Sequence, residues 1–167
     1  MHRKLGILWV EDDPNDVTLI QRAFQRFAIA PLHICCHGED AVQYVNGDAP
    51  YTDRDQFPLP NVIMTDLNMP RLNGLELLRW FRADPRWQLL PIVIFSASAE
   101  QRDIQAAYGL GANAFFQKPM GLDRLIAVIG KIFDYWAEAL PPVTPQSASE
   151  STDYLGNHSE QNWMSRY

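Results

Sequence analysis

Short apolar runs that end in polar residues recur along this chain, and they constrain its fold more than any other feature. Four of them occupy residues 5–10, 61–65, 91–95 and 114–117. Unbroken apolar runs of this length are typical of strands that are buried on both faces of a parallel sheet. Between the runs, apolar residues recur at every third or fourth position, which is the period of an amphipathic helix. Strand and helix are therefore predicted to alternate.

A second strand is predicted at residues 32–36, which completes five strands and five helices in alternation. Parallel neighbours need a crossover connection, and one helix supplies it in each repeat. Because a parallel sheet is buried on both faces, helices are expected on both sides of it. The predicted fold class is α/β, with a doubly wound five-stranded parallel sheet of the form (βα)5.

Three of the predicted helices begin with local signals. Asp13 stands before Pro14, an arrangement that places an N-cap ahead of a proline at the first helical position. Asn73 and Ser98 are each followed three residues later by Glu or Gln, which is the spacing of a capping box. Asp13 is therefore interpreted first as a helix cap, and Ser98 as the cap of the fourth helix.

Two segments lack these periodic patterns. Residues 46–60 are rich in Pro, Gly and Asp, which predicts a long polar loop before the third strand. Residues 141–167 are polar and rich in Pro and Ser, which predicts a tail that builds no core of its own. The chain is expected to form one domain over residues 1–140, followed by this tail.

The bulk composition excludes several classes of function. A net charge of -6 and a pI of about 5.1 argue against direct DNA binding, which normally needs an excess of Lys and Arg. No apolar run is long enough to span a membrane, and acidic residues follow the basic N-terminus too soon for a signal peptide. The two cysteines, Cys35 and Cys36, are adjacent and unsuited to a disulfide with each other. A cytoplasmic protein is expected.

Polar residues at the predicted strand ends form the candidate site. These residues are Glu11, Asp12 and Asp13 after the first strand, Asp66 after the third, Ser96 after the fourth and Lys118 after the fifth. Ligands of open α/β sheets bind outside the carboxyl ends of the strands, so these side chains are expected to meet. Crowded carboxylates need a shared cation, and Mg²⁺ prefers carboxylate, water and phosphate oxygens. An aspartate can also accept a phosphoryl group, whose charge Lys118, Ser96 and Mg²⁺ would offset.

Four motifs follow one another at these strand ends. They are Val10-Glu11-Asp12-Asp13, Met64-Thr65-Asp66-Leu67-Asn68-Met69-Pro70 with Asn73-Gly74, Phe95-Ser96-Ala97, and Phe116-Gln117-Lys118-Pro119. In order and spacing they resemble the receiver domain of two-component response regulators over residues 5–140. The resemblance implies a flavodoxin-like fold and a single-domain response regulator, which takes a phosphoryl group from a sensor histidine kinase and switches conformation to control protein partners.

The resemblance also implies a role for each acidic position. Asp66 would be the phospho-acceptor, Asp12 would bind Mg²⁺ directly, and Glu11 would contact the ion through water. Asn68 would offer its backbone carbonyl to the metal. Lys118 would pair with a phosphoryl oxygen.

A second group of matching residues would report the phosphorylation. Ser96 would bind a phosphoryl oxygen, small Ala97 would leave access to the acceptor, and Phe115 would be the switch aromatic whose rotamer follows Ser96. The Lys118-Pro119 bond resembles one that is cis in the family, which would direct the ammonium at the site. A Phe at the switch position departs from the Tyr that is common there, so the switch would lack a hydroxyl.

Further motifs are similar to the small stand-alone regulators paired with bacterial phytochrome-type histidine kinases. They are Asp13-Pro14-Asn15-Asp16, the long loop at residues 46–60, residues 108–114, and Phe133-Asp134-Tyr135-Trp136. This resemblance implies a phytochrome-type kinase as the partner.

Two other functions share parts of this pattern. Aspartate-nucleophile phosphatases also use acidic strand ends with a hydroxyl and a lysine, but they need a second aspartate two residues after the nucleophile, where this chain has Asn68. A receiver fold used only for binding would have no need of the acidic, hydroxyl and lysine positions. A phospho-acceptor switch with slow self-dephosphorylation, rather than an enzyme with an external substrate, is therefore the predicted function.

His33, Cys35 and His37 alternate along the second predicted strand. Imidazole and thiolate are donors for transition metals. The motif is too short to specify a site, however, and an ordinary strand of mixed composition is the favoured interpretation.

The last predicted helix carries apolar residues on two sides. Beyond its core stripe, it adds Val128, Ile132, Tyr135 and Ala139. Exposed apolar surface of this kind often marks an interface, and we therefore hypothesise a homodimer through this helix.

Overall fold

All five predicted strands pair in one parallel sheet. The computed structural model describes residues 5–27, 33–140 and 142. The strands are β1 (Ile7–Val10), β2 (His33–Cys35), β3 (Val62–Thr65), β4 (Ile92–Ser96) and β5 (Ala114–Gln117). They lie in the order β2-β1-β3-β4-β5, and every neighbouring pair is parallel. The predicted (βα)5 sheet is confirmed, with strand ends that differ from the prediction by one or two residues.

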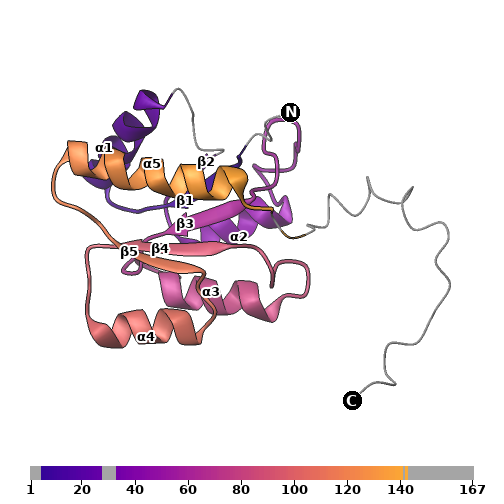
Figure 1. Ribbon diagram of the computed structural model, residues 1–167. Coiled ribbons are helices and arrows are strands. Elements are labelled where there is room, and N and C mark those ends of the chain that lie inside the picture. Colours follow the sequence, from indigo (N-terminus) through magenta and orange to yellow (C-terminus); the bar gives the residue numbers. More distant parts are fainter. Residues whose placement is uncertain (1–4, 28–32, 141, 143–167) are drawn as a thin grey trace, which may run out of the picture.

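Helices cover both faces of the sheet, as predicted. They are α1 (Pro14–Arg26), α2 (Gly38–Asn46), α3 (Gly74–Ala83), α4 (Gln101–Gly109) and α5 (Leu122–Glu138). Figure 1 shows α1 and α5 together on one face and α3 and α4 on the other. Because β1 lies between β2 and β3, the chain reverses its direction across the sheet at β1, and a crevice is expected beside its carboxyl end.

Alternate residues of each central strand supply two separate layers of the core. In β1, Ile7 and Trp9 pack with α1 and α5, while Leu8 and Val10 pack with α2 and α3. All four are at most 1% exposed. Burial on both faces explains why these strands are continuous apolar runs, and each such side chain stabilises the fold by about 1.5–3 kcal/mol.

Two of the three helix caps predicted from the sequence are confirmed. Asp13 caps α1 with Pro14 at the first position, and Asn73 forms a complete capping box with Glu76 at the start of α3. The prediction that Ser98 caps α4 was wrong. The cap position is Glu100, without a side-chain cap bond, because the Ser98 hydroxyl instead donates to Asp103 at 2.8 Å.

The loop after α2 is longer than most, and although many of its residues are exposed, it is anchored to the core by a few side chains. Tyr51 is only 5% exposed, and Phe57 packs against the same core layer. The Arg54 guanidinium donates to the carbonyls of Tyr44, Val45 and Phe57. Helix α2 ends at Asn46 and β3 begins at Val62, so this segment includes the long polar loop that the sequence predicted at residues 46–60, and two of its aromatic side chains pack into the core. Of the predicted tail at residues 141–167, only residue 142 lies within the described residues, so the domain boundary stays a prediction.

The apolar surface of α5 is narrower than the sequence suggested. Ile132 is 3% exposed and belongs to the core, and Val128 packs against the same layer. Tyr135, by contrast, is 67% exposed. No helix within the described ranges combines the length and apolarity needed to cross a membrane.

Candidate functional site

The predicted site residues meet at the carboxyl ends of the strands. Main-chain hydrogen bonds extend the sheet by one residue beyond three strands and so fix the starting points of the side chains. The Asp66 N–H donates to the Val10 carbonyl at 3.0 Å, and the Glu11 N–H donates to the Cys35 carbonyl at 2.9 Å. The Lys118 N–H donates to the Ser96 carbonyl at 2.7 Å. The site is thus built on the ladder of the sheet rather than on free loops.

Lys118 is the centre of the site. Its Nζ lies 2.7 Å from one carboxylate oxygen each of Glu11, Asp16 and Asp66. Burial alone lowers the pKa of this ammonium, but hydrogen bonds to the three carboxylates outweigh burial and raise the pKa above its ordinary value. Lys118 is therefore charged throughout the physiological range.

One member of this arrangement, Asp16, was not predicted. It lies in the first turn of α1, where acidic residues are common because they interact favourably with the helix N-terminus. That ordinary explanation concealed its contact with Lys118, which is 102 residues away in sequence. The useful signal would have been its place in the first turn of the helix that directly follows the acidic end of β1.

The two oxygens of Asp66 are held differently. Oδ2 faces Lys118, whereas Oδ1 accepts hydrogen bonds from the backbone N–H groups of Leu67 and Asn68. Gly74 brings the start of α3 against this turn, because a Cβ there would overlap the Asp66 carbonyl. Asp66 is 8% exposed, so its carboxylate is fixed in orientation while still open at one edge.

Three carboxylates in the pocket are arranged to share a cation. One oxygen each from Glu11, Asp12 and Asp66 lies within 4.8 Å of the others. Burial raises the pKa of Glu11 to about 7, with Lys118 lowering it and Asp66 adding to the increase. Asp12 is more exposed than either neighbour. A hard divalent ion fits this all-oxygen set, because its charge would offset carboxylates that Lys118 alone does not neutralise.

The residues predicted to report phosphorylation lie around this pocket. Ser96 is fully buried at the end of β4, and its Oγ accepts the N–H of Ser98 at 3.3 Å. Phe115 is half-buried against Leu67 and Ala107. Its backbone N–H donates to the hydroxyl of Tyr108, a residue of α4, at 3.2 Å.

The Lys118-Pro119 bond is trans, and the expected cis form was wrong. The Ala49-Pro50 bond is the cis peptide among the described residues. Lys118 reaches the acidic pocket nonetheless, because its Nζ is held by three carboxylates at once.

A doubly wound parallel sheet with carboxylates, a serine and a lysine converging beside β1 and β3 defines the receiver class of signalling proteins. The chain belongs to the response regulator receiver domain family, whose model matches residues 7–130. Phosphorylation of an aspartate and binding of Mg²⁺ or Mn²⁺ at an acidic pocket are general properties of this class.

The most similar relatives include regulators linked to phytochromes. Response regulator Rcp1 of Synechocystis sp. is 30% identical to this chain over 135 residues, which cover 80% of this chain and 90% of Rcp1. The Mn(2+)-bound structure of Rcp1 matches with a TM-score of 0.72 at 29% identity, and the match covers 83% of this chain and 99% of the Rcp1 chain. Response regulator RPA3017 in red light signaling of R. palustris is 31% identical with a TM-score of 0.77, over 84% of this chain and all of that one. The structure of the phosphorylated cyanobacterial phytochrome response regulator RcpA is 28% identical with a TM-score of 0.75, over 84% of this chain and all of that one.

Proposed function

We propose that this receiver domain accepts a phosphoryl group on Asp66 Oδ2 and passes the signal on by changing its protein contacts. The observation that carries the proposal is the triple contact of Lys118 with Asp66, Glu11 and Asp16, each at 2.7 Å. A lysine held beside a buried carboxylate is placed to neutralise the oxygens of an incoming phosphoryl group.

The residues fit a bound Mg²⁺, which supplies positive charge to the transferring phosphoryl oxygens. Asp12 and Asp66 would hold the ion with the backbone carbonyl of Asn68, and Glu11 would contact it through water. An all-oxygen donor set of carboxylates supports this assignment. The related Rcp1 has been solved with Mn(2+) bound.

The transfer itself makes and breaks one bond each. The P–N bond of a phosphohistidine breaks as the bond between phosphorus and Asp66 Oδ2 forms, and the imidazole leaves with the electron pair. Lys118 turns from the carboxylates toward the phosphoryl oxygens. Asn68 offers no carboxyl group to activate water, which supports slow self-dephosphorylation rather than turnover of external esters.

The signal would leave the pocket through Ser96 and the β5 side of the sheet. Ser96 Oγ bonds a phosphoryl oxygen, Phe115 moves with it, and the Tyr108 contact carries the change to α4. Helix α4 buries only Ala107 among its nine residues. Because so little packing holds it, α4 can shift at small cost.

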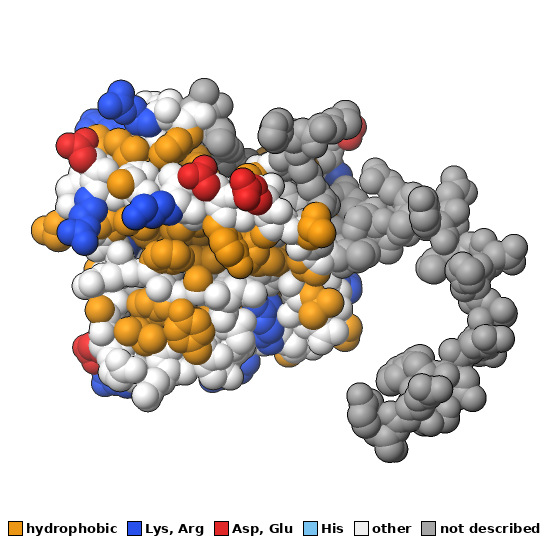
Figure 2. Space-filling model, viewed as in Figure 1, with side chains coloured by type: hydrophobic (Ala, Val, Ile, Leu, Met, Phe, Trp, Pro, Cys, Tyr) orange, Lys and Arg blue, Asp and Glu red, His pale blue; other side chains and the backbone are white. Residues whose placement is uncertain are grey.

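Two partners are proposed, a histidine kinase from the similarity to known regulators and a second copy of this chain from one hydrophobic face of the domain. We propose a phytochrome-type histidine kinase as the phosphodonor, in line with the similarity to the phytochrome response regulator RcpA. Figure 2 shows hydrophobic side chains gathered in a band across the face that carries α5 and β5. Tyr135 and Met120, 67% and 93% exposed, belong to the exposed hydrophobic residues of the domain, and we propose that this face forms a homodimer.

Intact mass measurement tests the acceptor. Wild type and Asp66→Asn are incubated with acetyl phosphate and Mg²⁺, and a base-labile adduct of one phosphoryl group is expected only on the wild type. Ser98→Ala, which changes a nearby hydroxyl outside the pocket, serves as the matched control. An adduct that persists on Asp66→Asn would overturn the assignment.

Light scattering tests the homodimer separately. A dimeric mass at micromolar concentration is expected for the wild type and a monomeric mass for Tyr135→Glu. A monomer in both cases, with and without phosphorylation, would remove the dimer from the proposal and leave the acceptor intact.

A further inference from the structure

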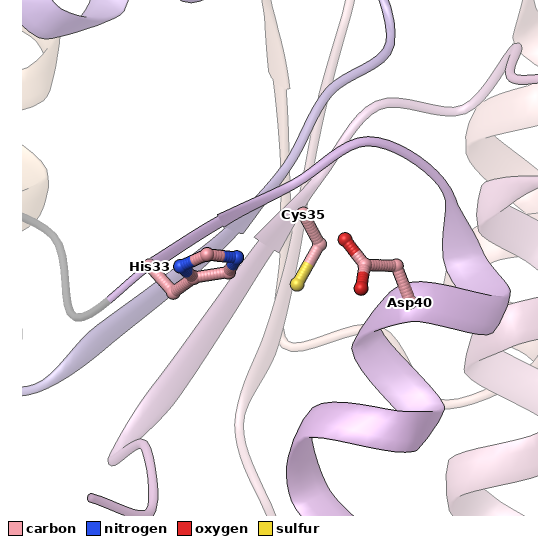
Figure 3. A group of neighbouring side chains, drawn as sticks. All are labelled: His33, Cys35 and Asp40. Atoms are coloured by element: carbon pink, nitrogen blue, oxygen red, sulfur yellow. The ribbon is translucent and has the colours of Figure 1, made fainter. Parts of the chain in front are cut away.

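A second group of metal-binding side chains lies away from the phosphorylation pocket, under the loop that follows α2. One donor atom each from His33, Cys35 and Asp40 lies within 4.8 Å of the other two. Figure 3 shows the His33 ring and the Asp40 carboxylate turned toward the Cys35 sulfur from opposite sides. His33 and Cys35 come from β2, and Asp40 comes from the first turn of α2.

The members of this group differ from those that the sequence suggested. His37 is turned away, because its Nδ1 accepts the Asp40 N–H in the cap of α2 and its Nε2 faces Arg71. Asp40 takes its place beside His33 and Cys35. A sequence pattern of alternating donors on a strand does not reveal a carboxylate that the following helix brings back over it.

Two of the three side chains, those of Asp40 and His33, are held by hydrogen bonds before any ion binds. The Asp40 carboxylate accepts the Cys36 N–H at 3.1 Å and the Tyr51 hydroxyl at 2.6 Å. That hydroxyl also lies 3.1 Å from Nε2 of His33. Outer hydrogen bonds of this kind orient the ligands of metal sites, and Tyr51 brings a further oxygen donor to the same place.

We propose that His33, Cys35 and Asp40, with Tyr51 beside them, form a structural Zn²⁺ site. One imidazole nitrogen, one thiolate and one carboxylate suit zinc, whereas Mg²⁺ takes oxygen ligands only. Burial raises the pKa of the Cys35 thiol, so the ion would displace its proton. The resulting thiolate and the Asp40 carboxylate together carry two negative charges, which balance the two positive charges of the ion. The bound ion would join β2, α2 and the loop at residues 47–61, which are separate in sequence.

The competing interpretation is that the four side chains form only a hydrogen-bonded cluster. In that case Tyr51 donates a hydrogen bond to Asp40 and accepts one from His33, and the cluster does not bind zinc. The two interpretations differ in one measurable property, which is stoichiometric uptake of zinc that depends on the Cys35 sulfur.

Zinc titration decides between them. The full chain without an affinity tag is stripped with a chelator, supplied with millimolar Mg²⁺ to occupy the acidic pocket, and titrated with Zn²⁺ against a chromophoric chelator. We expect one equivalent of tightly bound zinc on the wild type and on Asp66→Asn. Cys35→Ser and Asp40→Asn remove proposed ligands and are expected to weaken binding by more than the roughly tenfold to hundredfold that loss of an outer-shell partner costs.

Two matched variants and a second metal keep the result unambiguous. Cys36→Ser and His37→Asn change the same residue types one or two positions away and should bind zinc as the wild type does. Co²⁺ should give a thiolate charge-transfer absorption that is absent from Cys35→Ser. Circular dichroism and labelling by acetyl phosphate check that Cys35→Ser is folded. No stoichiometric uptake, or equal loss in Cys36→Ser, would overturn the proposal.

Discussion

The acidic pocket at Asp66 and the cluster at Cys35 are both groups of close polar side chains, yet their charges are arranged in opposite ways. In the pocket, the single ammonium of Lys118 faces three carboxylates at 2.7 Å, with Asp12 nearby. In the cluster, one carboxylate, that of Asp40, receives a hydroxyl and a backbone N–H as donors.

This difference indicates that the pocket is suited to binding and releasing charged groups, whereas hydrogen bonds fix the side chains of the cluster. Carboxylates outnumber the single ammonium in the pocket, and this arrangement favours the binding of a cation or a proton. In the cluster, the Tyr51 hydroxyl and the Cys36 N–H hold the Asp40 carboxylate, and these hydrogen bonds stabilise the local fold. The donor atoms differ as well, since oxygen alone suits Mg²⁺ and mixed nitrogen, sulfur and oxygen suit Zn²⁺.

The largest expected effect concerns the pocket alone. Lys118→Met removes the only cation that faces Asp66 in the described structure and should slow labelling by acetyl phosphate by about 10²–10³-fold, the usual cost of losing one donor to transition-state charge. The measurement is the rate of adduct formation by intact mass. Cys35→Ser should label at the wild-type rate, and an equal decrease in both variants would mean that the two groups are not functionally separate.

The next effect is on the pH dependence of metal binding. Burial raises the pKa of Glu11 from 4.5 to about 7, so the folded protein holds a proton there that a cation must displace. Affinity for Mg²⁺ should therefore rise by up to about tenfold per pH unit below pH 7 and level off above it. Titrations at several pH values measure this slope, which should be nearly absent in Glu11→Gln.

Ionisation of Glu11 should affect the stability of the metal-free protein in the opposite direction, because stability should fall with rising pH while Mg²⁺ affinity rises. Between pH 4.5 and 7 the folded state binds more protons at Glu11 than the unfolded state does, so the free energy of unfolding should fall as pH rises through this window. Urea unfolding in a chelator measures it. A flat profile in the wild type would contradict the assigned environment of Glu11.

A smaller effect should distinguish the cluster. Tyr51→Phe leaves Asp40 and His33 without their shared hydroxyl, which should cost about 2 kcal/mol in the free energy of unfolding. Urea unfolding in the absence of metals gives the value. Tyr135→Phe, at an exposed position, is the control and should change nothing, and labelling of Asp66 should be normal in both variants.

The smallest effect is expected from Asp16→Asn. The side chain of Asp16 is 35% exposed, so solvent screens its interaction with Lys118, and two other carboxylates still hold the ammonium. The labelling rate should change by roughly twofold to fivefold, since exposed ion pairs contribute little. A change as large as that in Lys118→Met would place Asp16 among the groups that carry the reaction.

Much of the fold and most of the pocket could be predicted because one rule governs both. Strands that are buried on two faces leave continuous apolar runs, and in a parallel sheet the residues that end them meet at one edge. Glu11, Asp66, Ser96 and Lys118 were found in this way, and the structure brings them together at the carboxyl edge of the sheet.

The features that were missed depend on packing between segments that no local pattern connects. Asp16 and Asp40 lie in first turns of helices, where an acidic residue has an ordinary explanation. Tyr51 is in a loop whose Pro and Asp content indicates exposure, yet the aromatic ring is buried beside His33 and Tyr44. The Ser98 cap failed because Asp103, five residues on, competes for its hydroxyl.

The hydrogen bond between the Glu11 N–H and the Cys35 carbonyl has a thermodynamic consequence. It joins one residue of the pocket to one residue of the cluster through a single peptide group. If an ion at Cys35 displaces that carbonyl, the affinity of the pocket for its own ion changes by some factor, and linkage requires that the pocket alter zinc affinity by the same factor. Ion binding at the pocket and zinc binding at the cluster would then each change the affinity of the other site by that factor.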